Sequence, residues 1–414
     1  MSADLERVGQ AAKNAAVSAA KLTAAEKDRV LNQCAEALES NSEHILKENN
    51  CDLESAEGIK ESFRDRLRLS ASRVKSMADG LRQVAALPDP TNEAVSMKNL
   101  PNGLAVIQKR VPMGVIAVIY EARPNVTADA FGLCFKAGSS VILRGGKEAI
   151  RSNTAIAQVF RDVLAANGLN PDMVQIMTDT SHETARKLMR LNGYIDLLIP
   201  RGGAGLIRSA VENSSIPVIE TGVGNCHIFM DESADINKAV PIIINAKTQR
   251  PGVCNAVEKL LIHERIAAEY LPVIAAALRE KGVELRGDKR AVSLVPDVIP
   301  AAEEDWHAEY ADLIIAIKVV ADIDEAIEHI RTYSSNHSEA VITENYTNAQ
   351  RFLNEVDSAA VYVNASTRFT DGGEFGFGAE IGISTQKLHA RGPMGLKELT
   401  STKYIIYGNG QIRL

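Results

Sequence analysis

From residue 115 onward the chain alternates short apolar runs with helical segments, and this alternation constrains the fold more than any other feature. The apolar runs have the length of strands and lie at 115–120, 140–143, 173–177, 194–199 and 216–219. The helical segments between them lie at about 126–137, 148–166, 181–191 and 204–213. Such alternation predicts a parallel sheet with helices on both faces. In an open sheet of this kind, ligands bind outside the carboxyl ends of the strands.

The alternation restarts near residue 225. The second set of apolar runs lies at 226–230, 257–262, 313–320, 340–342 and 359–363. Helical segments at about 235–246, 265–281, 322–332 and 346–356 link them. A chain of 414 residues is too long for one ordinary hydrophobic core. We therefore expect two α/β domains, each with its own parallel sheet.

The first ninety residues are predicted to be helical. An alanine-rich periodic segment fills 4–22, and Thr23-Ala-Ala-Glu26 is a capping box that should start a second helix. A third helix is expected from about 64 to 86, before the Pro-containing segment that follows it. The charged side of these helices is interpreted as a solvated face.

Two further segments predict β-structure outside the main sheets. Asn102-Gly103 lies between 97–100 and 104–110 and favours a two-residue hairpin turn with positive φ at both positions. Residues 402–407 are predicted to form a last strand. A lone hairpin is marginally stable, so both segments predict contact with a second subunit and at least a homodimer, or a homotetramer.

Composition narrows the functional class. The net charge of −7 does not favour non-specific binding to nucleic acid, and no apolar run is long enough to predict a membrane span. The five cysteines are scattered, and neither they nor the histidines have metal-ligand spacing. The acidic N-terminal segment does not resemble a signal peptide. We therefore expect a cytoplasmic protein without a metal site or disulfides.

The segment 247–256, which reads KTQRPGVCNA, places Cys254 in a turn before an apolar strand. Lys247 and Arg250 bring positive charge to this segment, which would lower the pKa of a thiol. The two cations could instead bind an anionic substrate, and the residues alone do not choose. A single cysteine is more often an ordinary buried residue, so the rest of the chain has to support a nucleophile.

Two strand-to-helix turns are suited to an anionic cofactor. The strand at 140–143 runs into Arg144-Gly145-Gly146-Lys147, and the strand at 194–199 runs into a turn with the residues Arg201, Gly202 and Gly203. Glycines let the backbone approach a ligand, the helix N-terminus presents N–H groups, and the cations neutralise phosphate. Two such turns in one sheet predict a phosphate-bearing cofactor.

Two polar loops are candidates for substrate contacts. Asn125 follows the first strand of the sheet and could donate to a developing oxyanion. Taken alone, it is better interpreted as a cap of the helix that follows. Ser366 and Arg368 follow the last strand of the second domain, where they suit a carboxylate or phosphate, although a surface arginine is an equal alternative.

Taken together, these segments resemble the aldehyde dehydrogenase superfamily. The residues that carry the resemblance are 111–125, 142–147, 198–205, 245–251 with Cys254 and Asn255, 361–373, and 384–395. With the helical N-terminal region, the likeness covers nearly the whole chain. It is strongest to the branch that reduces the acyl phosphate L-glutamyl 5-phosphate to L-glutamate 5-semialdehyde in proline biosynthesis. The resemblance implies an NADP-dependent oxidoreductase that uses NADPH, and it allows transfer of the acyl phosphate from glutamate 5-kinase.

The resemblance also implies roles at matching positions. Cys254 would be the nucleophile, and Asn125 would stabilise the oxyanion. Glu309 is similar to a glutamate on the cofactor side, and Lys147 would favour the 2′-phosphate of NADPH. The full set of expected cofactor residues is Arg144, Gly145, Gly146, Lys147, Arg201, Gly202, Gly203 and Glu309. The expected substrate residues are Ser366, Arg368, Arg250 and Lys247, with Arg201 as an alternative.

The expected domains follow from the same assignments. Residues 1–96 and 112–224 would bind the cofactor, 225–385 would carry the nucleophile, and 97–111 with 386–414 would form the oligomerisation element. Three other functions stay open. An oxidising aldehyde dehydrogenase would release its acyl group to water, a cysteine hydrolase would need a histidine near Cys254, and a scaffold would have lost activity.

Overall fold

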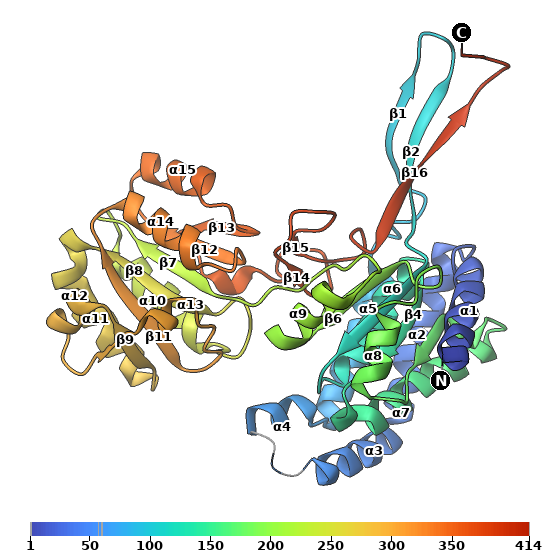
Figure 1. Cartoon of the computed structure of the whole chain (residues 1–414), viewed down its shortest axis with the longest axis horizontal. Coiled ribbons are helices and arrows are strands. Elements are labelled where there is room, and N and C mark those ends of the chain that lie inside the picture. Colours follow the sequence, from blue (N-terminus) through green and yellow to red (C-terminus); the bar gives the residue numbers. More distant parts are fainter. Residues whose placement is uncertain (1, 57, 59–60, 414) are drawn as a thin grey trace. The chain divides into compact units, whose positions relative to one another are not determined.

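The computed structural model describes residues 2–56, 58 and 61–413 and divides into two compact units (Figure 1). The first unit runs up to Thr221 and adds Gly376–Gly382 and the chain from Met394 onward. The second unit comprises Gly222–Phe375 and Ile383–Pro393. Residues 386–393, which the sequence grouped with the C-terminal strand, lie in the second unit instead.

The N-terminal region is helical, as predicted. Its helices are α1 (Ser2–Ala19), α2 (Ala24–Ser40), α3 (Ser42–Ser55), α4 (Glu61–Leu67) and α5 (Ala71–Ala86). The capping box at the start of α2 is confirmed, because Thr23 Oγ1 accepts from Glu26 N–H and Glu26 Oε2 accepts from Thr23 N–H. The predicted single helix over 64–86 is wrong. Ser70 is extended, and its hydroxyl accepts from Arg73 N–H at 3.2 Å, so it starts α5 as a new helix.

The first unit contains a four-stranded parallel sheet in the order β5-β4-β3-β6. Its strands are β3 (Val115–Tyr120), β4 (Ser140–Arg144), β5 (Val174–Ile176) and β6 (Leu197–Arg201). The connecting helices are α6 (Asn125–Lys136), η1 (Lys147–Ala149), α7 (Ile150–Ala166), η2 (Pro171–Met173), α8 (His182–Leu188) and α9 (Ala204–Asn213). The predicted strand at 216–219 is reduced to one bridge between Val218 and Leu198. Pro217 has no N–H and cannot donate to a ladder.

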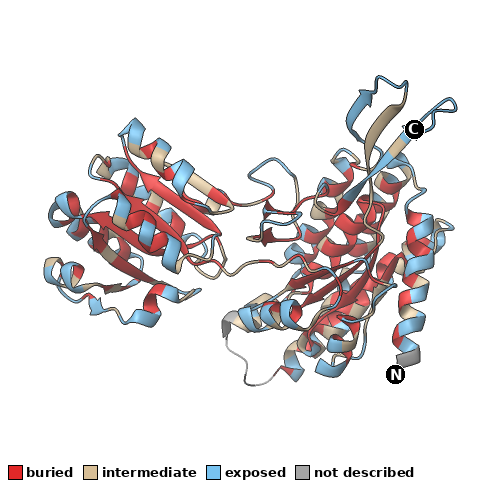
Figure 2. Cartoon of the chain, turned by 45° about the horizontal axis from the view of Figure 1, so that its top comes forward, coloured by how far each residue is buried: buried red, intermediate tan, exposed pale blue. Residues whose placement is uncertain are grey.

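The strands of this sheet are largely buried, and Figure 2 shows them mostly in red. All six residues of β3 are buried. Val115, Ala117 and Ile119 belong to one core cluster together with residues of α1 and α9. Consecutive strand residues point to opposite faces, so the other residues of β3 face the opposite side. A strand buried on both faces explains why its sequence is an unbroken apolar run.

A separate three-stranded antiparallel sheet also belongs to the first unit. Its order is β1 (Ala94–Asn99), β2 (Ala105–Pro112) and β16 (Thr400–Tyr407). The predicted hairpin and the last strand are therefore confirmed as strands, and they pair with each other. The predicted two-residue turn is wrong, because residues 100–104 connect β1 to β2 and Gly103 has positive φ whereas Asn102 does not.

The second unit is built on a seven-stranded parallel sheet in the order β10-β9-β11-β8-β7-β12-β13. Its strands are β7 (Cys226–Met230), β8 (Val257–His263), β9 (Glu284–Gly287), β10 (Ile299–Pro300), β11 (Ile314–Val320), β12 (Ser338–Ile342) and β13 (Ala360–Val363). Its helices are α10 (Ile236–Thr248), α11 (Glu264–Glu280), α12 (Lys289–Leu294), α13 (Glu303–His307), α14 (Ile323–Tyr333), α15 (Tyr346–Glu355) and η3 (Thr367–Phe369). A short antiparallel pair, β14 (Ile383–Ser384) with β15 (Gly392–Pro393), completes this unit. The expected fold, with two parallel-sheet α/β units, is confirmed. The sequence missed β9, α12, β10 and α13.

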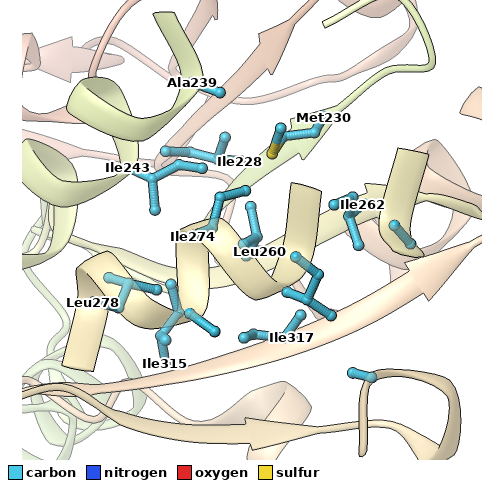
Figure 3. Close-up of a cluster of buried hydrophobic side chains, with 14 of the residues drawn as sticks. Ile228, Met230, Ala239, Ile243, Leu260, Ile262, Ile274, Leu278, Ile315 and Ile317 are labelled. Carbon is cyan, nitrogen blue, oxygen red and sulfur yellow. The ribbon is translucent and has the colours of Figure 1, made fainter. Parts of the chain in front are cut away.

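Along the central strands of the second sheet, neighbouring side chains point to opposite faces and belong to two different hydrophobic clusters. Ile228 and Met230 of β7 belong to one cluster with Leu260 and Ile262 of β8 (Figure 3). Phe229 of β7 belongs to the opposite cluster, which includes residues of α14 and α15. The central strands β7, β8, β11 and β12 are therefore held on both faces, which fixes their register.

The residues that the structure describes include neither a membrane-spanning helix nor a metal-binding cluster. Within 2–56, 58 and 61–413, no helix combines the length and the apolar character needed to cross a bilayer. The same residues contain no cluster of three or more His, Cys, Asp or Glu side chains suited to hold a metal ion.

Candidate active site

Cys254 lies in the turn that connects α10 to β8, three residues before the strand begins. Its side chain is partly exposed, in contrast to the fully buried thiols of Cys34, Cys134 and Cys226. The turn is closed by a hydrogen bond of 3.0 Å from Ala256 N–H to the carbonyl of Val253. The prediction that Cys254 lies in a turn directly before an apolar strand is confirmed.

The loop that contains η3 holds this turn through Asn255, which is 4% exposed. The Asn255 amide donates to the carbonyls of Thr370 at 2.9 Å and Arg368 at 3.3 Å. Its own backbone carbonyl accepts from Thr367 Oγ1 at 2.7 Å, and its side-chain oxygen accepts from the Arg368 guanidinium. Residues more than 110 positions apart in sequence are therefore locked together next to Cys254.

The backbone of Cys254 is packed against the segment that leads into β7. The buried Cys226 thiol donates to the Cys254 carbonyl at 3.1 Å. A Cβ on Gly224 would lie 1.5 Å from that same carbonyl oxygen, so only glycine fits there. Burial raises the pKa of Cys226 well above its usual value, which makes Cys226 a packing residue and not a second reactive thiol.

Arg368 and Arg250 bring positive charge to Cys254. Burial lowers the pKa of Arg368, the charge of Arg250 lowers it further, and the charge of Cys254 opposes both effects. The Arg368 guanidinium is half-buried and also donates to Gln249 Oε1 at 3.0 Å. Arg250 is exposed. Two arginines and a reachable thiol therefore share one neighbourhood, which suits an anionic substrate.

Lys247 does not join this neighbourhood. It lies on α10, fully buried, and donates to the Val257 carbonyl and to Glu258 Oε2, both at 3.0 Å. Burial lowers the pKa of Lys247, and burial raises the pKa of Glu258 to about 7. The ammonium is committed to a buried pair, which speaks against the predicted contact with substrate.

Ser366 and Glu309 take positions beside the same turn. Ser366 is 5% exposed, and its hydroxyl accepts from Arg368 N–H at 3.3 Å as the cap of η3. It therefore orients the arginine and presents little surface itself. Glu309 lies between α13 and β11, and its Oε1 accepts from Gly224 N–H at 2.8 Å. Through Gly224, Glu309 supports the backbone that contacts Cys254.

In the first unit, the residues Arg144 to Gly146 of the turn after β4 are buried. Arg144 is 7% exposed and donates to the carbonyls of Thr180 and Ser181. A Cβ on Gly145 would lie 2.1 Å from Asn153 Nδ2, and one on Gly146 would lie 2.6 Å from a carboxylate oxygen of Glu148. These glycines are buried and allow packing. Arg144, Gly145 and Gly146 are therefore weaker candidates for direct contact with a cofactor than the sequence suggested.

Lys147 follows this turn and differs from its neighbours. It is exposed at the carboxyl edge of the sheet, in η1. Within the described part of the chain, its ammonium has no hydrogen bond or ion pair. Of the first cationic turn, Lys147 alone presents its charge to solvent.

The turn after β6, in contrast, is exposed to solvent at both of its glycines. Gly202 and Gly203 are exposed and precede α9, whose cap residue Gly203 has no side chain to satisfy the helix N-terminus. Glu121, from the end of β3, supplies a carboxylate that accepts from Gly203 N–H at 2.9 Å. Arg201 is half-buried, and its charge lowers the pKa of Asp129. This turn has the features that the sequence assigned to both turns.

Asn125 is exposed at the first position of α6. The interpretation as a cap is wrong, because Pro124 holds the cap position and the Asn125 side chain makes no capping bond. The Asn125 amide instead donates to Asp129 Oδ2 at 3.1 Å, one helical turn along. Burial raises the pKa of Asp129 to about 6, against the effects of Asn125 and Arg201. One N–H of the Asn125 amide remains to donate elsewhere.

The predicted residues thus form one group in each unit. Cys254, Arg250, Arg368, Ser366 and Glu309 gather around the turn before β8. Asn125, Lys147 and Arg201 to Gly203 lie at the carboxyl edge of the first sheet. Sequence reasoning missed the roles of Asn255, Gly224 and Glu121. The Cys254-Asn255 pair and the glycine before β7 were visible, but their contacts depend on pairing between distant segments.

A model of the aldehyde dehydrogenase family matches residues 1–301. The chain is 60% identical over 407 residues to the gamma-glutamyl phosphate reductase of Clostridium botulinum, with 98% of each chain covered. It is 56% identical over 411 residues to that of Lachnospira eligens, with 99% of each covered.

Solved structures give the same result. The crystal structure of the gamma-glutamyl phosphate reductase of Thermotoga maritima superposes with a TM-score of 0.97 at 50% identity, covering 99% of this chain and 100% of that one. These likenesses extend over the whole described fold, including both parallel sheets and the separate antiparallel sheet. The chain therefore belongs to the aldehyde dehydrogenase family, among the gamma-glutamyl phosphate reductases, and is an oxidoreductase.

Proposed function

We propose that this enzyme reduces L-glutamyl 5-phosphate to L-glutamate 5-semialdehyde and phosphate, with NADPH as the reductant, as a step of proline biosynthesis. The names of the relatives at 56–60% identity support the substrate. The observation that carries the mechanism is a partly exposed Cys254 whose backbone packs against Gly224 and Cys226, with the charge of Arg368 close enough to interact with Cys254 and Arg250. An anionic acyl phosphate and a thiolate are the reactants that such a site suits.

The thiolate of Cys254 attacks the acyl carbon and forms a C–S bond. The C–O bond to phosphate breaks, and phosphate leaves with the electron pair. The amide of Asn125 and the backbone N–H of Cys254 are proposed to hold the oxyanion. Phosphate is a good leaving group, so this step needs no strong acid. After reduction, the thiohemiacetal on Cys254 collapses, the C–S bond breaks, and the aldehyde leaves with the thiolate restored.

The first unit fits a dinucleotide. A Cβ on Gly202 would lie 2.6 Å from the Glu121 carboxylate, so glycine keeps the backbone accessible at the start of α9. Gly202, Gly203 and Arg201 are proposed to hold the diphosphate, and the exposed Lys147 the 2′-phosphate that distinguishes NADPH from NADH. A nicotinamide bound there would supply the hydride. Glu309 is proposed on the cofactor side of Cys254.

The substrate contacts follow from charge and exposure in the second unit. Arg368 is proposed to bind one anionic end of the substrate, with Arg250 at the other. Ser366 would act by orienting Arg368. Lys247 is left out of this set because it is buried against Glu258.

We also propose that the antiparallel sheet joins subunits into a homodimer or homotetramer in the cytoplasm. All of β1 is exposed, and large apolar side chains of β16 face solvent, including Tyr404 at 64% and Tyr407 at 62%. Exposed apolar surface of this kind marks an interface. Direct transfer of the acyl phosphate from glutamate 5-kinase stays a prediction.

The proposed reaction is tested in reverse, by following NADP⁺ reduction with L-glutamate 5-semialdehyde in the presence and absence of phosphate. Turnover should require phosphate, and Cys254→Ala should lower it by at least about 10³-fold while the melting temperature is retained. Cys51→Ala, at a partly exposed cysteine on α3, is the matched control and should keep wild-type turnover. Phosphate-independent turnover would identify an oxidising aldehyde dehydrogenase, and near-normal turnover by Cys254→Ala would exclude this nucleophile.

A further inference from the structure

Glu121 lies at the point where the order of strands in the first sheet reverses. The chain passes from β3 to β4 and β5 on one side and returns to β6 on the other side of β3. Tyr120, the last residue of β3, pairs with Arg201 of β6, and Glu121 N–H donates to the Arg201 carbonyl at 3.2 Å. Ligands of open parallel sheets bind in the crevice at such a reversal. Glu121 therefore stands at the position where this architecture receives a ligand.

The carboxylate of Glu121 occupies the N-terminus of α9. Its Oε2 accepts from Gly203 N–H at 2.9 Å, and the same oxygen would lie 2.6 Å from a Cβ on Gly202. Free N–H groups and the helix dipole make a helix N-terminus a site for anions. Here the anion at that site is a side chain of the protein itself.

The first glycine turn, Gly145-Gly146 after β4, approaches Glu121 from the side of β4. A Cβ on Gly146 would lie 3.7 Å from Glu121 Cα. The negative charge of Glu121 also acts on Arg144, where it opposes the lowering of the pKa by burial. Glu121 is therefore placed between the two cationic turns and neutralises part of the positive charge that would attract a phosphate-bearing cofactor.

We propose that Glu121 is a determinant of cofactor affinity, because its carboxylate occupies the place of the cofactor diphosphate and must leave when the cofactor binds. This inference rests on the proposed use of NADP⁺ and NADPH. Diphosphate and carboxylate cannot share one N–H donor, and two anions at the same helix terminus repel each other. Binding must therefore break the bond between Glu121 and Gly203. In this structure the bond between Glu121 and Gly203 N–H holds the turn in shape until the cofactor replaces the carboxylate.

The test is the affinity of Glu121→Gln for NADP⁺, measured by isothermal titration calorimetry at low and high salt, with no turnover required. The variant keeps the size of the side chain and an oxygen acceptor but loses the charge. We expect NADP⁺ to bind about 5- to 20-fold more tightly at low salt, with a smaller gain at high salt. Inorganic diphosphate alone should show the same direction of change, since it carries the competing group.

Glu183→Gln is the matched control, because it removes one negative charge from α8 of the same unit. It should leave the affinity for NADP⁺ within about twofold of wild type, because the Glu183 carboxylate is exposed and accepts from Lys187 Nζ at 2.6 Å on its own helix. An unchanged dissociation constant for Glu121→Gln would overturn the proposal. Weaker binding would also overturn it and would make Glu121 a cofactor ligand. If neither wild type nor variant bound NADP⁺ or diphosphate, the cofactor assignment itself would fail, whereas loss of the Cys254 mechanism alone would leave these affinities untouched.

Discussion

The candidate site of the first unit lies at the carboxyl ends of its strands, whereas the candidate nucleophile of the second unit lies at the amino end of a strand. In the first unit the residues follow the carboxyl ends of β3, β4 and β6, where glycines and a helix N-terminus provide backbone groups. In the second unit Cys254 precedes the amino end of β8. There the position of the thiol depends on side chains from distant segments, above all Asn255 and Arg368.

A site built from backbone groups is easier to recognise in a sequence than a site built from side chains. A backbone site is built by residues that are adjacent in sequence, because a strand, a turn and a helix follow one another. A site built by side chains depends on which strands become neighbours. Replacing glycines or cations in the first unit should therefore change cofactor affinity, whereas replacements in the second unit should change turnover.

The largest effect within this comparison is expected for Arg368→Ala. Loss of a charge-assisted contact to an anionic substrate should lower kcat/KM about 100-fold, or about 3 kcal/mol, with little change in the dissociation constant of NADP⁺. Arg368→Lys should recover part of the loss. The matched control is Arg351→Ala, at a partly exposed arginine of α15 in the same unit, which should keep wild-type kinetics. If Arg368→Ala lowered the affinity for NADP⁺ as much as it lowered turnover, the assignment of cofactor binding to the first unit and of substrate chemistry to the second would be contradicted.

A pair of glycine variants gives the next largest effect. Gly224→Ala would place a Cβ 1.5 Å from the Cys254 carbonyl oxygen, so we expect a loss of about 1–3 kcal/mol in stability and a drop in turnover. Gly205→Ala, in α9, meets no atom within 4 Å and has no positive φ. It should be neutral or stabilise by up to about 1 kcal/mol. Urea unfolding of both variants measures the contrast, and similar costs would show that the close approach at Gly224 is unimportant.

The smallest effect is expected for Lys147→Ala. Its exposed ammonium should contribute about 10-fold to the affinity for NADP⁺ and nothing to the affinity for NAD⁺. Calorimetric titrations with the two cofactors separate these outcomes. Lys187→Ala, on α8, is the control for the loss of one positive charge from this unit. An equal loss for NAD⁺ would remove Lys147 from the 2′-phosphate.

Most of the fold was predictable from the sequence, because a strand covered on both faces leaves an apolar run such as 115–120. The break at Ser70 and the loss of a strand at Pro217 show local capping and proline chemistry overruling periodicity. The elements β9 and α12 were missed because they are short. They carry few apolar residues in any regular pattern.

The site was only partly predictable. Cys254 was recognisable from its turn, but the burial of Lys247 was not, because a cation beside a cysteine in sequence can still point into the core. The predicted cofactor contact of Arg144 is weakened in a similar way, because its guanidinium donates to the carbonyls of Thr180 and Ser181 in a different loop. The occupation of the α9 N-terminus by Glu121 depends on β3 and β6 being neighbours, which sequence order does not reveal.

The thioester on Cys254 is the central claim, and it is tested most directly by a single-turnover experiment without phosphate. Mixing the enzyme with L-glutamate 5-semialdehyde and NADP⁺ should give a burst of about one NADPH per subunit, because the acyl group then stays on the enzyme. Mass spectrometry should find that acyl group on the peptide with Cys254, and phosphate should restart turnover. Absence of both burst and adduct, or an adduct on another cysteine, would contradict the account.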